Sequence, residues 1–169
     1  MPKVDLGRLE RERRITVHED VAPDDPMWEG SEIHLLGPLE ARLEAQKVGA
    51  DVIVRGQLRG EVGLECRRCL KDVTLEFDES VSFLYRAGLE PAEAAAEEVD
   101  PLPARARELD LGEPIREHLL LSVPKYVVCC EACRGLCPRC GTDLNVEECR
   151  CEATEFDDRW APLRKLKED

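Results

Sequence analysis

Nine cysteines, most of them closely paired, constrain this 169-residue chain more than any other feature of its sequence. Eight of them form two C-x-x-C pairs, one C-x-x-x-C pair and one C-x-C pair. In chain order the pairs are Cys66 with Cys69, Cys129 with Cys133, Cys137 with Cys140, and Cys149 with Cys151. A C-x-x-C turn and an extended C-x-C segment each present two thiols to one side, which suits a tetrahedral metal site. The spacing therefore predicts metal binding.

Eight thiols are enough for two zinc ions with four cysteine ligands each. We expect the last two pairs to form a compact local site, and the first two pairs to form a site that attaches the tail to the rest of the protein. The local site comprises Cys137, Cys140, Cys149 and Cys151. The attaching site comprises Cys66, Cys69, Cys129 and Cys133. Cys130 is left over and could exchange roles with Cys129, so one or two structural zinc ions are predicted.

Other uses of the cysteines remain open. The first residues, "MPKVDLGRLERERRITV", contain no apolar signal segment, so a cytoplasmic location is expected, where disulfides are disfavoured. Four cysteines also ligate iron–sulfur clusters. The "CRRC" pair could be a thioredoxin-like redox motif, although that motif needs a strand followed by a helix. No run approaches the ~20 apolar residues that span a bilayer, so no membrane partner is expected.

The formal net charge of −13 argues against a broad nucleic-acid-binding face and favours a basic partner or a local basic patch. Five arginines lie beside the cysteines in sequence. They are Arg67, Arg68, Arg134, Arg139 and Arg150. They could simply balance thiolate charge, or they could also form a basic face that meets RNA phosphates. Both interpretations remain open.

No catalytic constellation is visible. The chain lacks a Walker A loop and the GxGxxG, HExxH and GxSxG motifs, and His18, His34 and His118 are scattered. We therefore expect a protein that is not an enzyme and has no small-molecule substrate.

Short alternating runs predict an antiparallel sheet from residue 39 onward. "LEARLEAQKVG" alternates as a strand, although Leu39 and Leu43 also have helical spacing. "ADVIVRGQLRG" and "EVGLEC" are expected to be separate strands that split at Gly60, and "DVTLEF" and "VSFLY" would follow as two more. Four or five strands would form this meander. Earlier in the chain, "RITV" is strand-like, and Trp28 is predicted to be a core or interface anchor.

"LDLGEPIREHLLLSVP" predicts a short strand and then a helix. Pro114 suits the first helical turn, and Pro124 would end the helix. Ile115, Leu119 and Leu120 would face the core. The predicted fold class is α+β: an antiparallel sheet or partial barrel, a short packed helix and a C-terminal cysteine-rich module similar to a zinc ribbon.

Composition divides the chain into four predicted parts. An N-terminal segment (1–38) would join the sheet, and a meander with its helix (39–125) would contain a mobile acidic loop (88–108). A cysteine-rich zinc module (126–156) and an amphipathic C-terminal segment (157–169) would follow.

The order of these features resembles a known family. "LECRRCL" follows the strands, "LDLGEPIREHLLLSVP" follows the acidic loop, and "CCEACRGLCPRCGTDLNVEECRC" leads into "DDRWAPLRKL". Together they resemble the YceD family of large-subunit ribosomal RNA accumulation proteins, from about residue 39 to the end. The family pattern C-x-x-x-C-x-G-L-C-x-x-C-G selects Cys129 rather than Cys130.

The resemblance implies a non-enzymatic cytoplasmic factor for accumulation or processing of 23S rRNA and assembly of the large ribosomal subunit. Its partner would be large-subunit rRNA or a basic ribosomal protein. Some family members lack the tail but keep the pair that matches Cys66 and Cys69, so the resemblance places the functional surface near "CRRCL". The alternative function is that of a redox- or zinc-responsive regulator.

Overall fold

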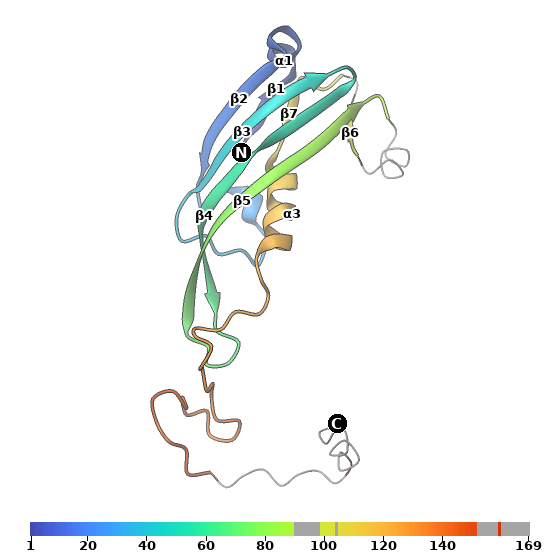
Figure 1. The fold of residues 1–169 in the computed structure, drawn as a ribbon. Coiled ribbons are helices and arrows are strands. Elements are labelled where there is room, and N and C mark those ends of the chain that lie inside the picture. Colours follow the sequence, from blue (N-terminus) through green and yellow to red (C-terminus); the bar gives the residue numbers. More distant parts are fainter. Residues whose placement is uncertain (90–98, 104, 152–158, 160–169) are drawn as a thin grey trace.

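A long antiparallel sheet forms the body of the protein, and a cysteine-rich tail extends past one end of it (Figure 1). The computed structural model describes residues 1–89, 99–103, 105–151 and 159. The sheet order is β2-β3-β4-β5-β6, with β6 parallel to β5 and every other neighbouring pair antiparallel. Its strands are β2 (Arg14–Val21), β3 (Leu39–Val48), β4 (Asp51–Glu65), β5 (Asp72–Ala87) and β6 (Asp100–Leu102).

The other regular elements of the described residues are a second sheet of two short strands and three helical segments. The small sheet pairs β1 (Lys3–Asp5) with β7 (Glu108–Asp110). The helical segments are α1 (Leu6–Glu12), the 3-10 turn η1 (Pro26–Trp28) and α3 (Gly112–Ser122). The α+β class with a C-terminal cysteine-rich module is confirmed. Within the described residues, no helix is long and apolar enough to cross a membrane.

The segment "LEARLEAQKV" is a strand, as its alternation predicted. Leu39, Ala41, Leu43 and Ala45 are each no more than 2% exposed and point to one face, while the residues between them are half-buried or exposed. Period-two burial of this kind is what an extended chain on a half-buried sheet produces. The alternative helix is therefore wrong.

The predicted break at Gly60 is also wrong, because β4 continues through it and β5 joins the two runs expected to be separate strands. Gly60 pairs with Phe77 of β5. A Cβ at this glycine would lie 2.9 Å from the Phe77 ring, so the glycine makes room for an aromatic side chain. Glycine inside a strand often marks such a close approach, and here it does not end the strand.

The helix α3 packs on one face of the sheet and closes the core (Figure 1). Ile115 and Leu119 are fully buried, whereas Leu120 is only half-buried. The observed core face of the helix is therefore slightly narrower than the predicted one. Pro114 lies in the first turn and the helix ends before Pro124, both as predicted. Trp28 is 7% exposed and its indole N–H donates to the carbonyl of Ala22, which confirms it as a core anchor.

The helix α1 was not predicted from the sequence. Its N-cap is Asp5, whose side chain accepts a hydrogen bond from the backbone N–H of Arg8, and the helix ends where Arg13 adopts a positive φ. Its charged residues obscured a single buried position, Leu9. A seven-residue helix with one buried residue leaves too little hydrophobic periodicity to recognise.

Ten of the twenty-one residues of the predicted acidic loop (88–108), and all of the predicted C-terminal segment (157–169) except residue 159, lie outside the described residues. The described part of 88–108 contains β6, which pairs with β5 at the edge of the sheet. This segment was predicted to be a loop. Residues 90–98 and 104 are outside the description, as are 152–158 and 160–169.

A close backbone approach at Gly56 gives a test of the fold. Gly56 lies opposite Leu43, and a Cβ there would fall 2.0 Å from the carbonyl oxygen of Arg42. We expect Gly56→Ala to lower the free energy of unfolding by about 1–3 kcal/mol, measured by urea denaturation, because two paired strands must separate locally. The control Gly37→Ala, which has no heavy atom within 4 Å of the added Cβ, should leave stability within about 0.5 kcal/mol. Equal effects of the two substitutions would contradict this account of the sheet.

Candidate metal centre

The turn between β4 and β5 presents the first pair of thiols. The N–H of Cys66 donates to the carbonyl of Lys71 at 2.8 Å, and the N–H of Leu70 donates to the carbonyl of Cys66 at 2.9 Å. Leu70 follows the second cysteine with a φ of 59°, an unusual conformation for a residue with a branched side chain. The strained conformation of Leu70 therefore closes a turn in which both thiols point the same way.

The turn that contains Cys137 and Cys140 repeats this geometry. The N–H of Cys137 donates to the carbonyl of Thr142 at 2.8 Å, and the N–H of Gly141 donates to the carbonyl of Cys137 at 2.9 Å. Gly141 has a φ of 74°, at the position equivalent to Leu70. Two segments that are far apart in sequence therefore adopt the same thiol-presenting turn.

The first set of thiols joins the sheet to the tail. Its members are Cys66, Cys69, Cys129 and Cys133, and their sulfur atoms all lie within 4.8 Å of one another. The Sγ atoms of Cys66 and Cys133 are 3.8 Å apart, and those of Cys69 and Cys129 are 3.6 Å apart. A tetrahedron of sulfurs about 2.3 Å from a zinc ion has edges of about 3.8 Å, so the spacing fits one metal ion.

The second set lies wholly within the tail. Its members are Cys137, Cys140, Cys149 and Cys151, again within 4.8 Å of one another. The Sγ atom of Cys149 lies 3.5 Å from that of Cys140 and 3.3 Å from that of Cys137. All nine cysteines are free thiols, and the spacings are far longer than the ~2.05 Å of a disulfide. The structure thus brings together the same two groups of four that the spacing predicted; metal binding itself stays a prediction.

The two sets differ in their access to solvent. Three of the four thiols of the first set are buried, and Cys129 is exposed. In the second set only Cys137 is buried, and Cys140 and Cys151 are exposed. Cys130 is exposed and belongs to neither set, which agrees with its prediction as the spare cysteine.

Within each set the thiols differ strongly in acidity. Burial favours the neutral form of Cys66, but N–H groups of Cys129, Arg68 and Cys69 together lower its pKa to about 6. The pKa of Cys129 is raised, chiefly by its contacts with Cys133 and Cys69.

The second set shows the same division. The hydrogen bond between the Cys140 thiol and the Thr142 hydroxyl is the main influence that lowers the pKa of Cys140 to about 6. Contact with Cys149 raises the pKa of Cys151 to about 12. Four adjacent thiols cannot all ionise without a cation, and a bound divalent metal would supply that positive charge.

Backbone contacts hold the tail against the β4–β5 turn. The N–H of Leu136 donates to the carbonyl of Arg68 at 2.9 Å, and the Arg68 guanidinium donates to the carbonyls of Glu131 and Cys133. Gly135, with a φ of 74°, allows this approach, since a Cβ there would lie 2.8 Å from the Arg68 carbonyl oxygen.

Side chains that the sequence interpretation overlooked also support the centre. Lys71 forms a 2.7 Å ion pair with Asp143, and the Asn145 side chain accepts from the N–H of Arg134 and donates to the sulfur of Cys133. Asp143 and Asn145 lie in the string "GTDLN" directly after the second C-x-x-C pair. In the sequence this string indicated only the resemblance to the YceD family.

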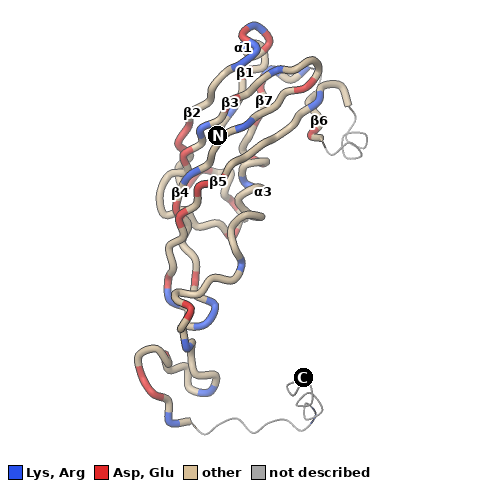
Figure 2. Tube along the Cα trace, in the orientation of Figure 1, with Lys and Arg blue, Asp and Glu red and all other residues tan. Residues whose placement is uncertain are grey.

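The five arginines fall into two groups. Arg68 is committed to tail carbonyls, so its role is structural. The side chains of Arg67, Arg134, Arg139 and Arg150 are exposed and make no ion pair among the described residues. Figure 2 shows basic positions at the β4–β5 turn and along the tail, separated from one another. The structure therefore does not join the five arginines into one basic face.

The "CRRC" pair lies between two antiparallel strands, so the strand–helix setting of a thioredoxin-like motif is absent. The three histidines belong to neither thiol set. His18 lies 3.3 Å from Arg42, and His118 meets the Phe83 ring edge-on.

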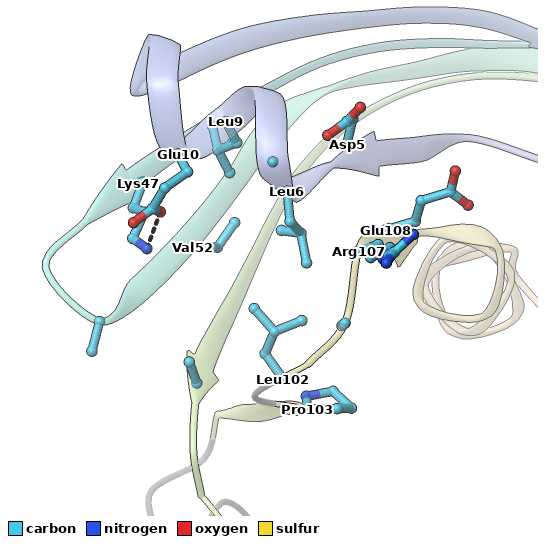
Figure 3. A pocket seen from close by; sticks show the side chains of 14 residues that line it. Asp5, Leu6, Leu9, Glu10, Lys47, Val52, Leu102, Pro103, Arg107 and Glu108 are labelled. Atoms are coloured by element: carbon cyan, nitrogen blue, oxygen red, sulfur yellow. Dashed lines mark hydrogen bonds and ion pairs between the residues drawn. The ribbon is translucent and has the colours of Figure 1, made fainter.

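A groove of about 670 Å³ lies at the other end of the sheet. Figure 3 shows Leu6 and Leu102 on its apolar floor, and the ion pair of Lys47 with Glu10 at its rim. Its fourteen lining residues include no serine, threonine, cysteine or histidine.

The comparisons with known proteins identify the family. Residues 54–167 match the family described as Large ribosomal RNA subunit accumulation protein YceD. The chain belongs to the YceD family. The match contains all nine cysteines, and it confirms the resemblance drawn from the sequence.

Two relatives illustrate how far the similarity extends. A Large ribosomal RNA subunit accumulation protein YCED homolog 1, chloroplastic, from Arabidopsis thaliana is 35% identical over 39% of this chain and 21% of its own length. An uncharacterized protein of Mycobacterium tuberculosis is 29% identical over 76% of this chain and 61% of its own length. The chain thus spans less than two thirds of these relatives. No solved structure matches the chain significantly.

The partition of the thiols can be tested by metal content. We expect the purified full chain to carry two metal ions and Cys66→Ser to carry one, because three thiols and a serine hydroxyl bind zinc far more weakly. Elemental analysis beside native mass spectrometry measures this. Cys130→Ser is the matched control and should retain both ions. Loss of an ion from the control, with no loss from Cys66→Ser, would contradict the assignment.

The difference in burial predicts an order of metal release. In excess EDTA, the exposed second set should lose its ion first, since the chelator reaches Cys140 and Cys151 directly. A colorimetric zinc assay should show two phases in the wild type. Cys137→Ser should abolish the fast phase and retain the slow one. A single phase shared by both ions would rule out independent sites.

Proposed function

We propose that this protein is a non-enzymatic cytoplasmic factor for the accumulation of 23S rRNA and the assembly of the large ribosomal subunit, with structural zinc in its tail. The family match over residues 54–167 carries this proposal. The name of the chloroplastic relative points in the same direction. The absence of a recognisable catalytic motif in the sequence supports a binding role.

Zinc is proposed because the described part of the tail, residues 126–151, has no apolar core to fold around. Between residues 126 and 151 the only buried side chains are those of Cys133 and Cys137. The small cluster at the β4–β5 turn consists of thiols with only Val73 and Leu136 packed against them. A segment this short folds stably when cross-links or metal replace the missing hydrophobic burial. Zinc supplies a tetrahedral, redox-inert link of this kind.

The charge distribution suggests what the protein binds. A chain of net charge −13 suits a basic ribosomal protein, whereas the exposed arginines of the turn and tail suit phosphate groups. We propose large-subunit rRNA, or a ribosomal protein assembled on it, as the partner. Neither requires a small-molecule substrate.

Depletion in the source cells tests the function. Loss of the protein should lower the ratio of 23S to 16S rRNA and reduce free 50S subunits on sucrose gradients, and wild-type protein should restore both. Cys66→Ser should restore less than the matched Cys130→Ser control, because the tail would no longer be fixed to the sheet. An unchanged rRNA ratio on depletion would refute the proposal.

A redox- or zinc-responsive regulator is the second candidate, favoured by the exposure of Cys140 and Cys151 in the second set. A regulator of this kind would leave the rRNA ratio of unstressed cells unchanged. The depletion experiment therefore separates the two functions.

A further inference from the structure

Tyr126 is the one fully exposed aromatic residue in the described part of the chain. Its side chain is 86% exposed, in the segment that connects α3 to the first thiol set. The other described aromatic residues, Trp28, Phe77, Phe83 and Tyr85, are buried or half-buried. A tyrosine ring that packs against so little of its own chain adds little to folding stability, which makes it a candidate contact for a partner.

Contacts with Arg67 hold the segment that contains this ring. The Arg67 guanidinium lies over it, 6.0 Å from the ring centre, and the Arg67 Nε–H donates to the carbonyl of Lys125 at 2.9 Å. The backbone N–H of Arg67 donates to the carbonyl of Val127 at 2.9 Å. Because Arg67 directly follows the fully buried Cys66, the connecting segment is anchored to the first thiol set.

The charges beside the ring are positive. Arg67 lies beside the Tyr126 ring in space, and Lys125 directly precedes Tyr126 in sequence. Both are exposed, and neither makes an ion pair among the described residues. The Arg67 guanidinium keeps N–H groups beyond the one bonded to Lys125. Proteins hold unpaired bases with an aromatic ring that stacks on the base and nearby cations, free of ion pairs, that meet the phosphates.

We propose that Tyr126, Arg67 and Lys125, here called the Tyr126 surface, bind an unpaired base and its phosphates in single-stranded RNA. The inference rests on the proposed function, since it names the part of the protein that contacts rRNA. Duplex RNA is a poor fit, because its bases are stacked on each other and cannot reach the ring. Of the arginines beside the cysteines, this assigns RNA contact to Arg67 and structural support to Arg68.

Fluorescence anisotropy with the metal-loaded full chain tests the proposal. The probes are a fluorescein-labelled 12-nucleotide single-stranded RNA of mixed sequence and the same strand annealed to its complement. The single strand should bind more tightly than the duplex. Tyr126→Ala should weaken binding roughly tenfold or more, as expected for loss of one stacked base. Tyr126→Phe, which keeps the ring, should bind within about twofold of the wild type.

Matched controls separate contact from folding. Val146→Ala removes another exposed apolar side chain of the tail, 70% exposed, and should bind RNA as the wild type does. Tyr126→Ala should keep its metal content and its midpoint of thermal unfolding. Arg67→Gln should weaken binding and reduce its salt dependence. No RNA binding by the wild type, equal binding of single strand and duplex, or wild-type binding by Tyr126→Ala would each overturn the inference.

The inference and the proposed function can fail separately. If Tyr126→Ala fails to restore the 23S to 16S ratio although the wild type binds no RNA, the surface contacts a protein; the inference is then wrong and the function stands. If depletion leaves the ratio unchanged while Tyr126→Ala still loses RNA binding, the function is wrong and the surface assignment stands.

Discussion

The contact between the β4–β5 turn and the tail, made through four cysteine thiols, is the interaction on which the position of the tail depends. Two of these thiols come from the end of the sheet and two from a segment about sixty residues later. Around them lie a few backbone hydrogen bonds and one ion pair, but almost no apolar burial. Without a cation, the thiols resist full ionisation and cannot hold the segments together. A bound metal ion would neutralise the thiolate charges and link the two segments through all four sulfur atoms.

The sheet and the tail are thus stabilised by different physical means. The sheet has a continuous core, closed by α3 and Trp28, in which close strand approaches at Gly56 and Gly60 accommodate a backbone carbonyl and an aromatic ring. The tail has thiols where a domain would have apolar side chains. Between residues 126 and 151 the tail therefore relies on thiol contacts and hydrogen bonds, several of them with the β4–β5 turn. Tyr126 lies next to this contact, with the Arg67 guanidinium of the β4–β5 turn 6.0 Å from its ring centre.

Several features of the fold could be predicted from the local spacing of residues in the sequence. Alternating burial in β3, the helix after Pro114 and the grouping of eight thiols into two sets were all predictable, because each depends on spacing of a few residues. Gly60 was misinterpreted as a break, since the reason for that glycine is Phe77 on the paired strand. The helix α1 escaped notice because its only buried position is Leu9. The support from Lys71 and Asn145 depends on contacts across the turn and the tail.

The sequence by itself determined which atoms could meet a metal: four cysteine pairs, at spacings that force each pair to one side of the chain. It also determined the family, because those spacings and the strings around them occur together. Only the tertiary structure decided what surrounds the thiols. It buried one set and exposed the other, committed Arg68 to backbone carbonyls, and left Tyr126 and Arg67 at the surface. Burial and charge environment arise from segments far apart in the chain, and local spacing holds no information about which of them will meet.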